Sequence, residues 1–178
     1  ICGEAMARAY HHRYGLNYVG LRYMNVYGPR QDYRGAYIAV IMEILDNIDK
    51  GLPPVVHGDG SQAYDFIYVE DCARANICAM KADTTDVFYN VGCGIKTTIA
   101  ELAEMISKVA QFDLEIDYRP ARPTSVRNRV SCPKKAQSEI GFQAKVALED
   151  GLRRVFAWAC QDKKRSLNVS PAKTTHAG

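Results

Sequence analysis

The sequence lacks paired cysteines, long apolar runs and a strong excess of one charge. Its six cysteines are scattered and none forms a CxxC pair, so a zinc site is not expected. No segment approaches the roughly 20 apolar residues of a membrane span, and no signal peptide is visible. These absences argue against a secreted disulfide framework and a membrane protein. They favour a cytoplasmic globular protein whose cysteines are reduced and buried.

Positive charge gathers near the end of the chain. The formal net charge is +3, and four basic residues lie in this last part, at Lys163, Lys164, Arg165 and Lys173. The rest of the chain is near neutral, so the sequence has no electrostatic footprint for nucleic acid or an anionic membrane. Residues 162–178 are polar and aperiodic, which predicts a disordered tail.

Two glycine-containing turns lack the pattern of a nucleotide loop. Gly58–Ser61 has no GxxxxGK[ST] signature, and Gly92–Gly94 lacks the third glycine of a dinucleotide fingerprint. The neighbouring His11 and His12 diverge by about 100° on a helix, so they do not predict a metal site. None of these features alone indicates a ligand.

Helical and extended patterns alternate along the chain. Helices are predicted over 1–14, from Tyr37 to Gly51, after Asp71, after Thr98, from Pro133 to Gly141 and over 148–161. Strands are predicted over 16–24, 54–57, 64–69, 87–91 and 114–118. This order predicts an α/β sheet protein with a smaller appended lobe.

Two helix starts carry specific signals. Asp71 is interpreted as an N-cap or first-turn acid rather than a catalytic base, because carboxylates there accept hydrogen bonds from free N–H groups. The tetrad Thr98–Glu101 matches a capping box.

The stretch Leu21–Arg30 places polar side chains where a predicted strand ends. In open α/β sheets, ligands bind at the carboxyl ends of the strands. A second polar segment holds Arg119 and Arg122 between prolines, and the planar arginine fork suits phosphate. Solvated surface arginines are the alternative interpretation of that segment.

Several short motifs follow one another in an order that resembles a known family. They are Glu4, Leu21–Pro29, Gly58–Ser61, Asp65–Asp71, Tyr89–Gly92, Arg122–Pro123 and Leu148–Leu152. Over residues 1 to about 160 the chain resembles the C-terminal half of an extended short-chain dehydrogenase/reductase of the NAD-dependent nucleotide-sugar epimerase/dehydratase family. Within that family it resembles the UDP-sugar 4-epimerases in particular.

The resemblance implies a division of the chain. Residues 1–27 would end an NAD-binding Rossmann domain. Residues 28–161 would form a smaller α/β substrate-binding lobe, interleaved with elements that return to the doubly wound sheet at about 65–92. In the family a Tyr-x-x-x-Lys motif opens the first helix, which places both catalytic residues before Ile1. The glycine-rich dinucleotide loop would lie further upstream, so we expect a fragment without catalytic residues.

The resemblance also assigns ligand contacts. Tyr23 would lie beside the nicotinamide of NAD, and Asn25 would contact the diphosphate of the sugar nucleotide. Val55, Val56 and His57 correspond to the strand whose backbone meets the nucleobase.

Two further positions concern the diphosphate. Arg122 corresponds to an arginine that pairs with it. Tyr64 stands where the family usually has another arginine, so a neutral phenol replaces a charge and binding would depend on Arg122 and Arg119. The dipeptide Thr124-Ser125 replaces the usual Gly-Asp, which leaves the particular sugar nucleotide open.

The implied activity of a complete enzyme is transient C4 oxidation of a UDP-sugar with NAD as cofactor. Dehydration or decarboxylation would share that first step. The alternatives are a catalytically inactive fragment and a small nucleotide-binding module. By the resemblance, the first helix would form a homodimer interface.

Overall fold

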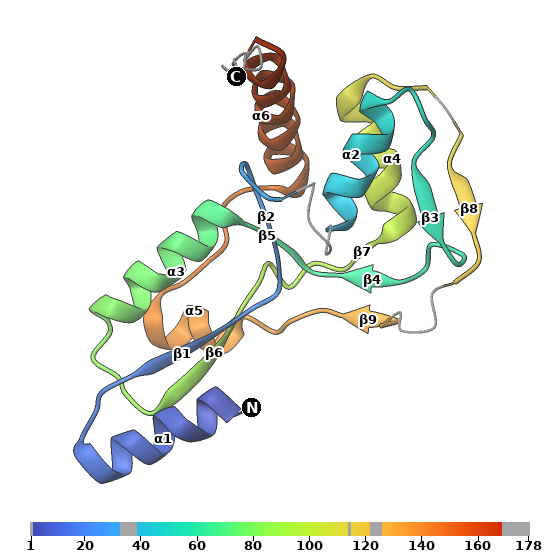
Figure 1. Cartoon of the computed structure of the whole chain (residues 1–178). Helices are drawn as coiled ribbons and strands as arrows, with labels where there is room; N and C mark the ends of the chain where they lie inside the picture. Colours follow the sequence, from blue (N-terminus) through green and yellow to red (C-terminus); the bar gives the residue numbers. More distant parts are fainter. Residues whose placement is uncertain (1, 33–38, 114, 122–125, 169–178) are drawn as a thin grey trace, which may run out of the picture.

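A computed structural model of the chain describes residues 2–32, 39–113, 115–121 and 126–168, with side chains as far as Asp162. Figure 1 shows helices interspersed with short strands along the chain. The helices are α1 (Cys2–Tyr14), α2 (Val40–Asp49), α3 (Val69–Lys81), α4 (Ile99–Ala110), α5 (Lys134–Ile140) and α6 (Leu148–Asn168). The strands are β1 (Val19–Tyr23), β2 (Asn25–Tyr27), β3 (Val55–His57), β4 (Ala63–Tyr64), β5 (Phe66–Tyr68), β6 (Val87–Val91), β7 (Thr97–Thr98), β8 (Asp117–Arg119) and β9 (Asn128–Arg129).

Parallel pairing dominates the strands. The pairs β1–β6, β2–β5, β3–β8 and β4–β9 are all parallel, and β4 also pairs with β7 in the antiparallel sense. Parallel neighbours need a crossover, and here helices provide most of them. The predicted α/β fold class is therefore confirmed.

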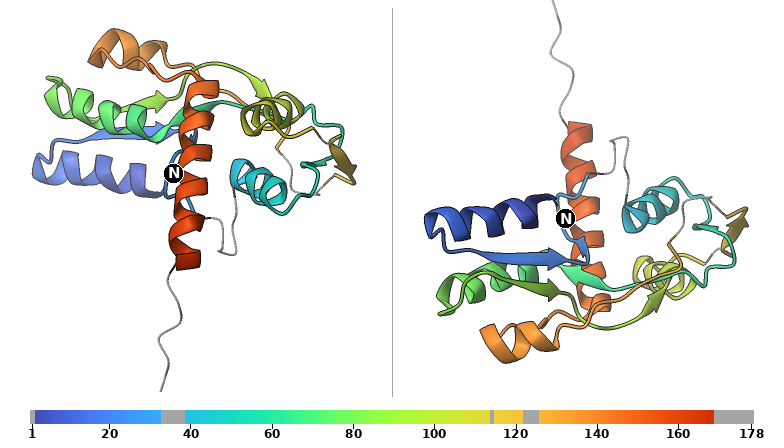
Figure 2. Two further views of the ribbon diagram at one scale, coloured as in Figure 1. Left: turned by 90° about the horizontal axis from the view of Figure 1, so that it is seen from above. Right: turned by 90° about the horizontal axis from the view of Figure 1, so that it is seen from below.

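The β1–β6 pair lies between helices. Figure 2 shows α1 on one face of the pair and α3 and α5 on the other. Because strand side chains alternate, Val19, Leu21 and Tyr23 pack into the core on the α3 side. Arg22 instead reaches α1 on the opposite face. The alternation along β1 thus separates an apolar contact from a polar one.

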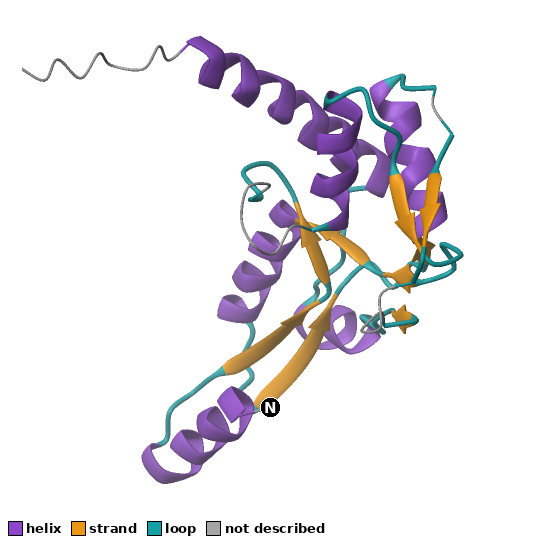
Figure 3. Ribbon diagram, turned by 45° about the vertical axis from the view of Figure 1, so that its right-hand side comes forward, coloured by secondary structure: helices purple, strands orange, loops and turns teal. Residues whose placement is uncertain are grey.

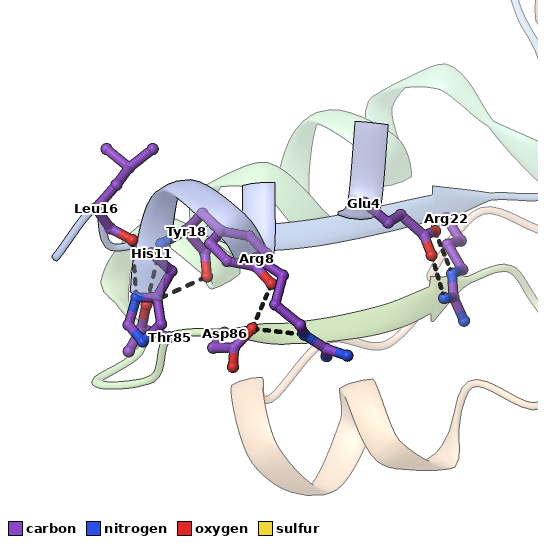
Figure 4. Close-up of polar contacts among 8 residues, drawn as sticks. All are labelled: Glu4, Arg8, His11, Leu16, Tyr18, Arg22, Thr85 and Asp86. Atoms are coloured by element: carbon purple, nitrogen blue, oxygen red, sulfur yellow. Dashed lines mark hydrogen bonds and ion pairs between the residues drawn. The ribbon is translucent and has the colours of Figure 1, made fainter. Parts of the chain in front are cut away.

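None of the described residues of α1 is buried, so polar contacts rather than apolar packing hold this helix against the sheet. Figure 4 shows the paired hydrogen bonds that Arg22 donates to Glu4, both at 2.6 Å. At the other end of α1, Arg8 Nε lies 3.1 Å from Asp86 Oδ1, and the Tyr18 hydroxyl donates to the same carboxylate. The outer face of α1 remains exposed.

Two apolar cores meet at β5. Ile67 belongs to the core of α3, β6 and α5, while Phe66 and Tyr68 belong to the core of α2, β3, α4 and α6. Figure 3 shows β3 and β8 beside α2 and α4, away from β1 and β6. Because side chains alternate along the three residues of β5, this strand contributes to both apolar cores. The division into residues 1–27 and 28–161 stays a prediction.

Local structure matches several predictions and corrects others. The capping box is confirmed, since Thr98 accepts from the Glu101 N–H and Glu101 accepts from the Thr98 N–H. The predicted strand over 64–69 is split at Asp65, and Val69 already belongs to α3. Helix α6 runs to Asn168, so the predicted disordered tail was wrong over 162–168. Its lysines and arginine favour a helix, which accounts for the longer α6.

Asp71 lies in the first turn of α3, as predicted, but it does not cap that helix. Its carboxylate is fully buried and accepts hydrogen bonds from the N–H groups of Lys145 and Val146, both at 3.1 Å. Arg74 forms an ion pair with it. The carboxylate thus ties α3 to the segment before α6.

The cysteines correct another expectation. All six are free, but Cys2, Cys132 and Cys160 are exposed and Cys72 alone is buried. Burial raises the pKa of the Cys72 thiol to about 11, and burial with the nearby Asp65 carboxylate raises the pKa of Cys93 to about 11. Among the described residues, every helix is too short or too polar to cross a membrane.

These thiols should differ in reactivity. At pH 8 only about one thousandth of a thiol with a pKa near 11 is thiolate. We expect an aromatic disulfide reagent to modify Cys2, Cys132 and Cys160 within minutes and Cys72 and Cys93 only after unfolding. Peptide mass spectrometry of the labelled chain would identify the sites. Rapid labelling of Cys72 in the folded chain would contradict its burial.

Candidate functional site

The chain changes its hydrogen-bonding partner between β1 and β2. Met24 N–H donates to Val91 O at 2.9 Å, on β6, and the next N–H, of Asn25, donates to Asp65 O at 3.0 Å, beside β5. Successive N–H groups of an extended chain point to opposite sides, so the strand passes between β6 and β5. Ligands of open α/β sheets bind where neighbouring strands diverge in this way.

Asp65 is the centre of this divergence. Its fully buried carboxylate accepts hydrogen bonds from Cys93 N at 2.8 Å, Gly94 N at 2.9 Å, and Ser131 N and Oγ at 3.3 and 2.6 Å. No cation is needed, because four donors satisfy the two oxygens. We call this group of Asp65, Gly92–Gly94 and Ser131 the Asp65 junction. It joins the loop after β6 to the segment before α5.

Gly92 fits the Asp65 junction because it has no side chain. A Cβ there would lie 2.3 Å from Asp65 Oδ2, 2.3 Å from Ser131 Oγ and 2.8 Å from Met24 Cγ. Gly94 has a φ of +70°, a backbone conformation that favours glycine. The Gly92-Cys93-Gly94 turn therefore has a structural reason for its two glycines.

Asn25 presents an unsatisfied polar group at the same place. Its side-chain Nδ2 is buried and donates no hydrogen bond within the described part of the chain. A buried donor without an acceptor costs about 1–3 kcal/mol. The amide is therefore suited to an acceptor oxygen that comes from a ligand.

Three predicted substrate residues lie together. Val55 and His57, on one face of β3, share a pocket of about 130 Å³ with Tyr64 of β4. Val56 points to the opposite face and is fully buried in the core. His57 Nδ1 lies 3.3 Å from Pro120 O, and the Tyr64 hydroxyl donates to Val126 O at 3.0 Å.

Other predicted residues lie elsewhere. Tyr23 lines an open depression against α3, and burial raises the pKa of its phenol although a hydrogen bond with Asn76 opposes this shift. Arg122 lies outside the described residues. The pocket of Val55, His57 and Tyr64 is thus separate from the surroundings of Tyr23.

Sequence reasoning missed some members of the site. Gln62 and Glu43 line the pocket of Val55, His57 and Tyr64, and Gln62 Nε2 donates to His57 O at 2.9 Å. Asp65 was part of a motif but received no role. The sequence could have indicated a role, because Asp65 is an acidic residue inside an otherwise apolar, β-branched segment. A carboxylate buried in such a segment needs several hydrogen-bond donors.

The chain is similar to known proteins in sequence and in fold. A family model described as the NAD dependent epimerase/dehydratase family matches residues 1–92. A putative UDP-glucose 4-epimerase of Methanocaldococcus jannaschii is 37% identical over 88% of this chain and 50% of its own length. The chain spans about half the length of the curated relatives it matches.

Solved structures show the same extent of similarity. UDP-glucose 4-epimerase of Thermotoga maritima, with UDP-glucose, has a TM-score of 0.86 at 33% identity, covering 91% of this chain and 52% of that one. UDP-N-acetylglucosamine 4-epimerase of Methanobrevibacter ruminantium, in complex with UDP-N-acetylmuramic acid, has a TM-score of 0.85 at 37% identity, covering 89% and 51%.

Proposed function

This chain belongs to the NAD dependent epimerase/dehydratase family, and on that premise we propose that it is the substrate-binding half of an NAD-dependent nucleotide-sugar 4-epimerase or dehydratase. The reaction proposed for the complete enzyme is transient oxidation of a UDP-sugar at C4. The presence of UDP-glucose with the similar Thermotoga maritima epimerase supports this ligand class. Decarboxylation and dehydration would begin with the same oxidation.

The buried amide of Asn25 is the observation that carries this proposal. It lies at the strand divergence, and its backbone N–H is fixed by Asp65 O. A ligand oxygen placed there would receive a hydrogen bond without the cost of ordering a mobile side chain. We assign this oxygen to the diphosphate end of the sugar nucleotide.

The pocket of Val55, His57 and Tyr64 is assigned to the nucleobase. At about 130 Å³ it suits one part of a ligand rather than a whole sugar nucleotide. Its wall combines apolar Val55 with polar groups that fix orientation. Arg122 is assigned to the diphosphate from the resemblance alone.

The described residues fit the cofactor only in part. Tyr23, half-buried and bonded to Asn76, is the residue that we assign beside the nicotinamide. The sequence has no GxGxxG loop for the phosphates of a dinucleotide. NAD, when bound by the complete enzyme, would supply the hydride acceptor.

Helix α1 is proposed as a contact between two copies of the chain. Met6, Tyr10 and Tyr14 recur every four residues and are 61%, 51% and 71% exposed. Side chains at that spacing share one face of a helix. A second copy covering this face would remove its apolar area from water.

Replacing Asn25 with alanine should weaken UDP-glucose binding by at least about tenfold, the loss expected for one hydrogen bond to a charged group. In the complete enzyme, turnover should fall as well. Isothermal titration calorimetry on the 178-residue chain measures the binding directly, and circular dichroism should show an unchanged fold.

Asn17→Ala is the matched control, because Asn17 is exposed and precedes β1. Its UDP-glucose affinity should stay within about twofold, roughly 0.4 kcal/mol. GDP titrated in parallel tests the base assignment. An unchanged affinity in Asn25→Ala would remove Asn25 from the site, and tighter binding of GDP than UDP would contradict a UDP-sugar.

A further inference from the structure

A diphosphate ligand needs positive charge near the base pocket, and the pocket itself does not provide it. Tyr64 is a neutral phenol, and Glu43 adds a carboxylate to the lining. The requirement for a cation follows from the proposed UDP-sugar, so the inference rests on the proposed function. The described arginines near the pocket come from β8 and β9.

Arg129 lies beside Tyr64. The two residues are directly opposite in the parallel β4–β9 pair, and Tyr64 is opposite Thr97 of β7 on its other side. Residues directly opposite in a sheet project from the same face. The side chain of Arg129 therefore leaves the sheet on the face from which Tyr64 enters the pocket.

The guanidinium of Arg129 is available for a ligand. Arg129 is exposed, and within the described part of the chain its side chain makes no hydrogen bond or ion pair. Arg119 occupies a similar register position opposite His57. Its Nε, however, lies 2.8 Å from Asp117 Oδ2, which offsets its charge.

We propose that Arg129 binds the diphosphate of the nucleotide sugar at the rim of the pocket formed by Val55, His57 and Tyr64. Its planar fork matches two phosphate oxygens at once. The backbone of Arg129 is held firmly, because its carbonyl accepts the Asp65 N–H at 3.0 Å. The backbone of Asp65 thus holds both residues, since its carbonyl also accepts the Asn25 N–H at 3.0 Å.

Calorimetric titrations with UDP and with uridine separate the phosphates from the base. Arg129→Ala should weaken UDP binding by about tenfold, about 1.4 kcal/mol, and change uridine binding by less than twofold. Arg129→Lys should keep part of the UDP affinity, because a lysine retains the charge but loses the fork. Tyr64→Arg, placed in the Arg129→Ala chain, should restore UDP binding, since it returns a cation one strand away.

Arg127→Ala is the control. It removes the same charge two positions along the chain, from a side chain whose positive charge interacts with the Asp59 carboxylate. It should leave UDP binding within about twofold. Equal losses in both alanine variants would indicate general positive potential and overturn the role of Arg129. An unchanged UDP affinity in Arg129→Ala would overturn this inference alone. No binding of UDP or uridine to the unaltered chain would overturn the proposed function and this inference together.

Discussion

Asp65→Ala should lower the free energy of unfolding by about 3–5 kcal/mol, the range expected when a buried polar network loses its centre. Removal of the carboxylate leaves the N–H groups of Cys93, Gly94 and Ser131 without their acceptor. The hydroxyl of Ser131 can rotate toward another acceptor, but the backbone N–H groups cannot. Urea denaturation followed by circular dichroism gives the difference in stability.

Asp65→Asn separates shape from hydrogen bonding. The asparagine retains one acceptor oxygen, and its amide N–H₂ faces N–H groups that also donate. We expect the free energy of unfolding of Asp65→Asn to lie between that of the wild type and that of Asp65→Ala. Asp59→Ala is the control, because that exposed carboxylate accepts from Ser61 alone among the described hydrogen bonds. A loss below about 1 kcal/mol for Asp65→Ala would show that water replaces the carboxylate.

Gly92→Ala should be nearly as damaging, with a loss of about 3 kcal/mol or a failure to fold. The added Cβ would fall 2.3 Å from both Asp65 Oδ2 and Ser131 Oγ, well inside contact distance. Because Ser131 Oγ donates a hydrogen bond to Asp65 Oδ2 at 2.6 Å, neither atom can move away without breaking the Asp65 junction. Thermal unfolding and UDP titration of the same sample would report the stability and the site.

Gly3→Ala provides the matched control. No heavy atom lies within 4 Å of a Cβ built at Gly3, in the exposed helix α1. Alanine there should leave the stability unchanged or raise it by up to about 1 kcal/mol. If Gly92→Ala unfolds like Gly3→Ala, the loop after β6 moves aside and the Asp65 junction is not rigid.

The successes of sequence reasoning were local. The capping box of Thr98 and Glu101 is made within four residues, so its pattern is complete in the sequence. Gly141 ends α5 with a φ of +66°, as a glycine after a short helix predicts. Periodicity likewise located most helices and strands, because it reports which face of an element is apolar.

The failures involved distant partners. Asp71 was predicted to cap its own helix, yet its carboxylate accepts hydrogen bonds from N–H groups 74 and 75 positions away. The cysteines were expected to be buried because most of them stand in apolar segments, yet Cys2, Cys132 and Cys160 are exposed. In each case a three-dimensional neighbour decided the environment.

By itself, the sequence determined the α/β class, the order of elements and the family motifs, since these depend on spacing along the chain. Tertiary structure alone decided that Asn25 lies between two strands with an unsatisfied amide, that Asp65 joins loops 28 and 66 positions away, and that Arg129 stands beside Tyr64. The physical reason is that hydrogen-bond partners and strand register are set by packing between distant segments, which no local pattern records.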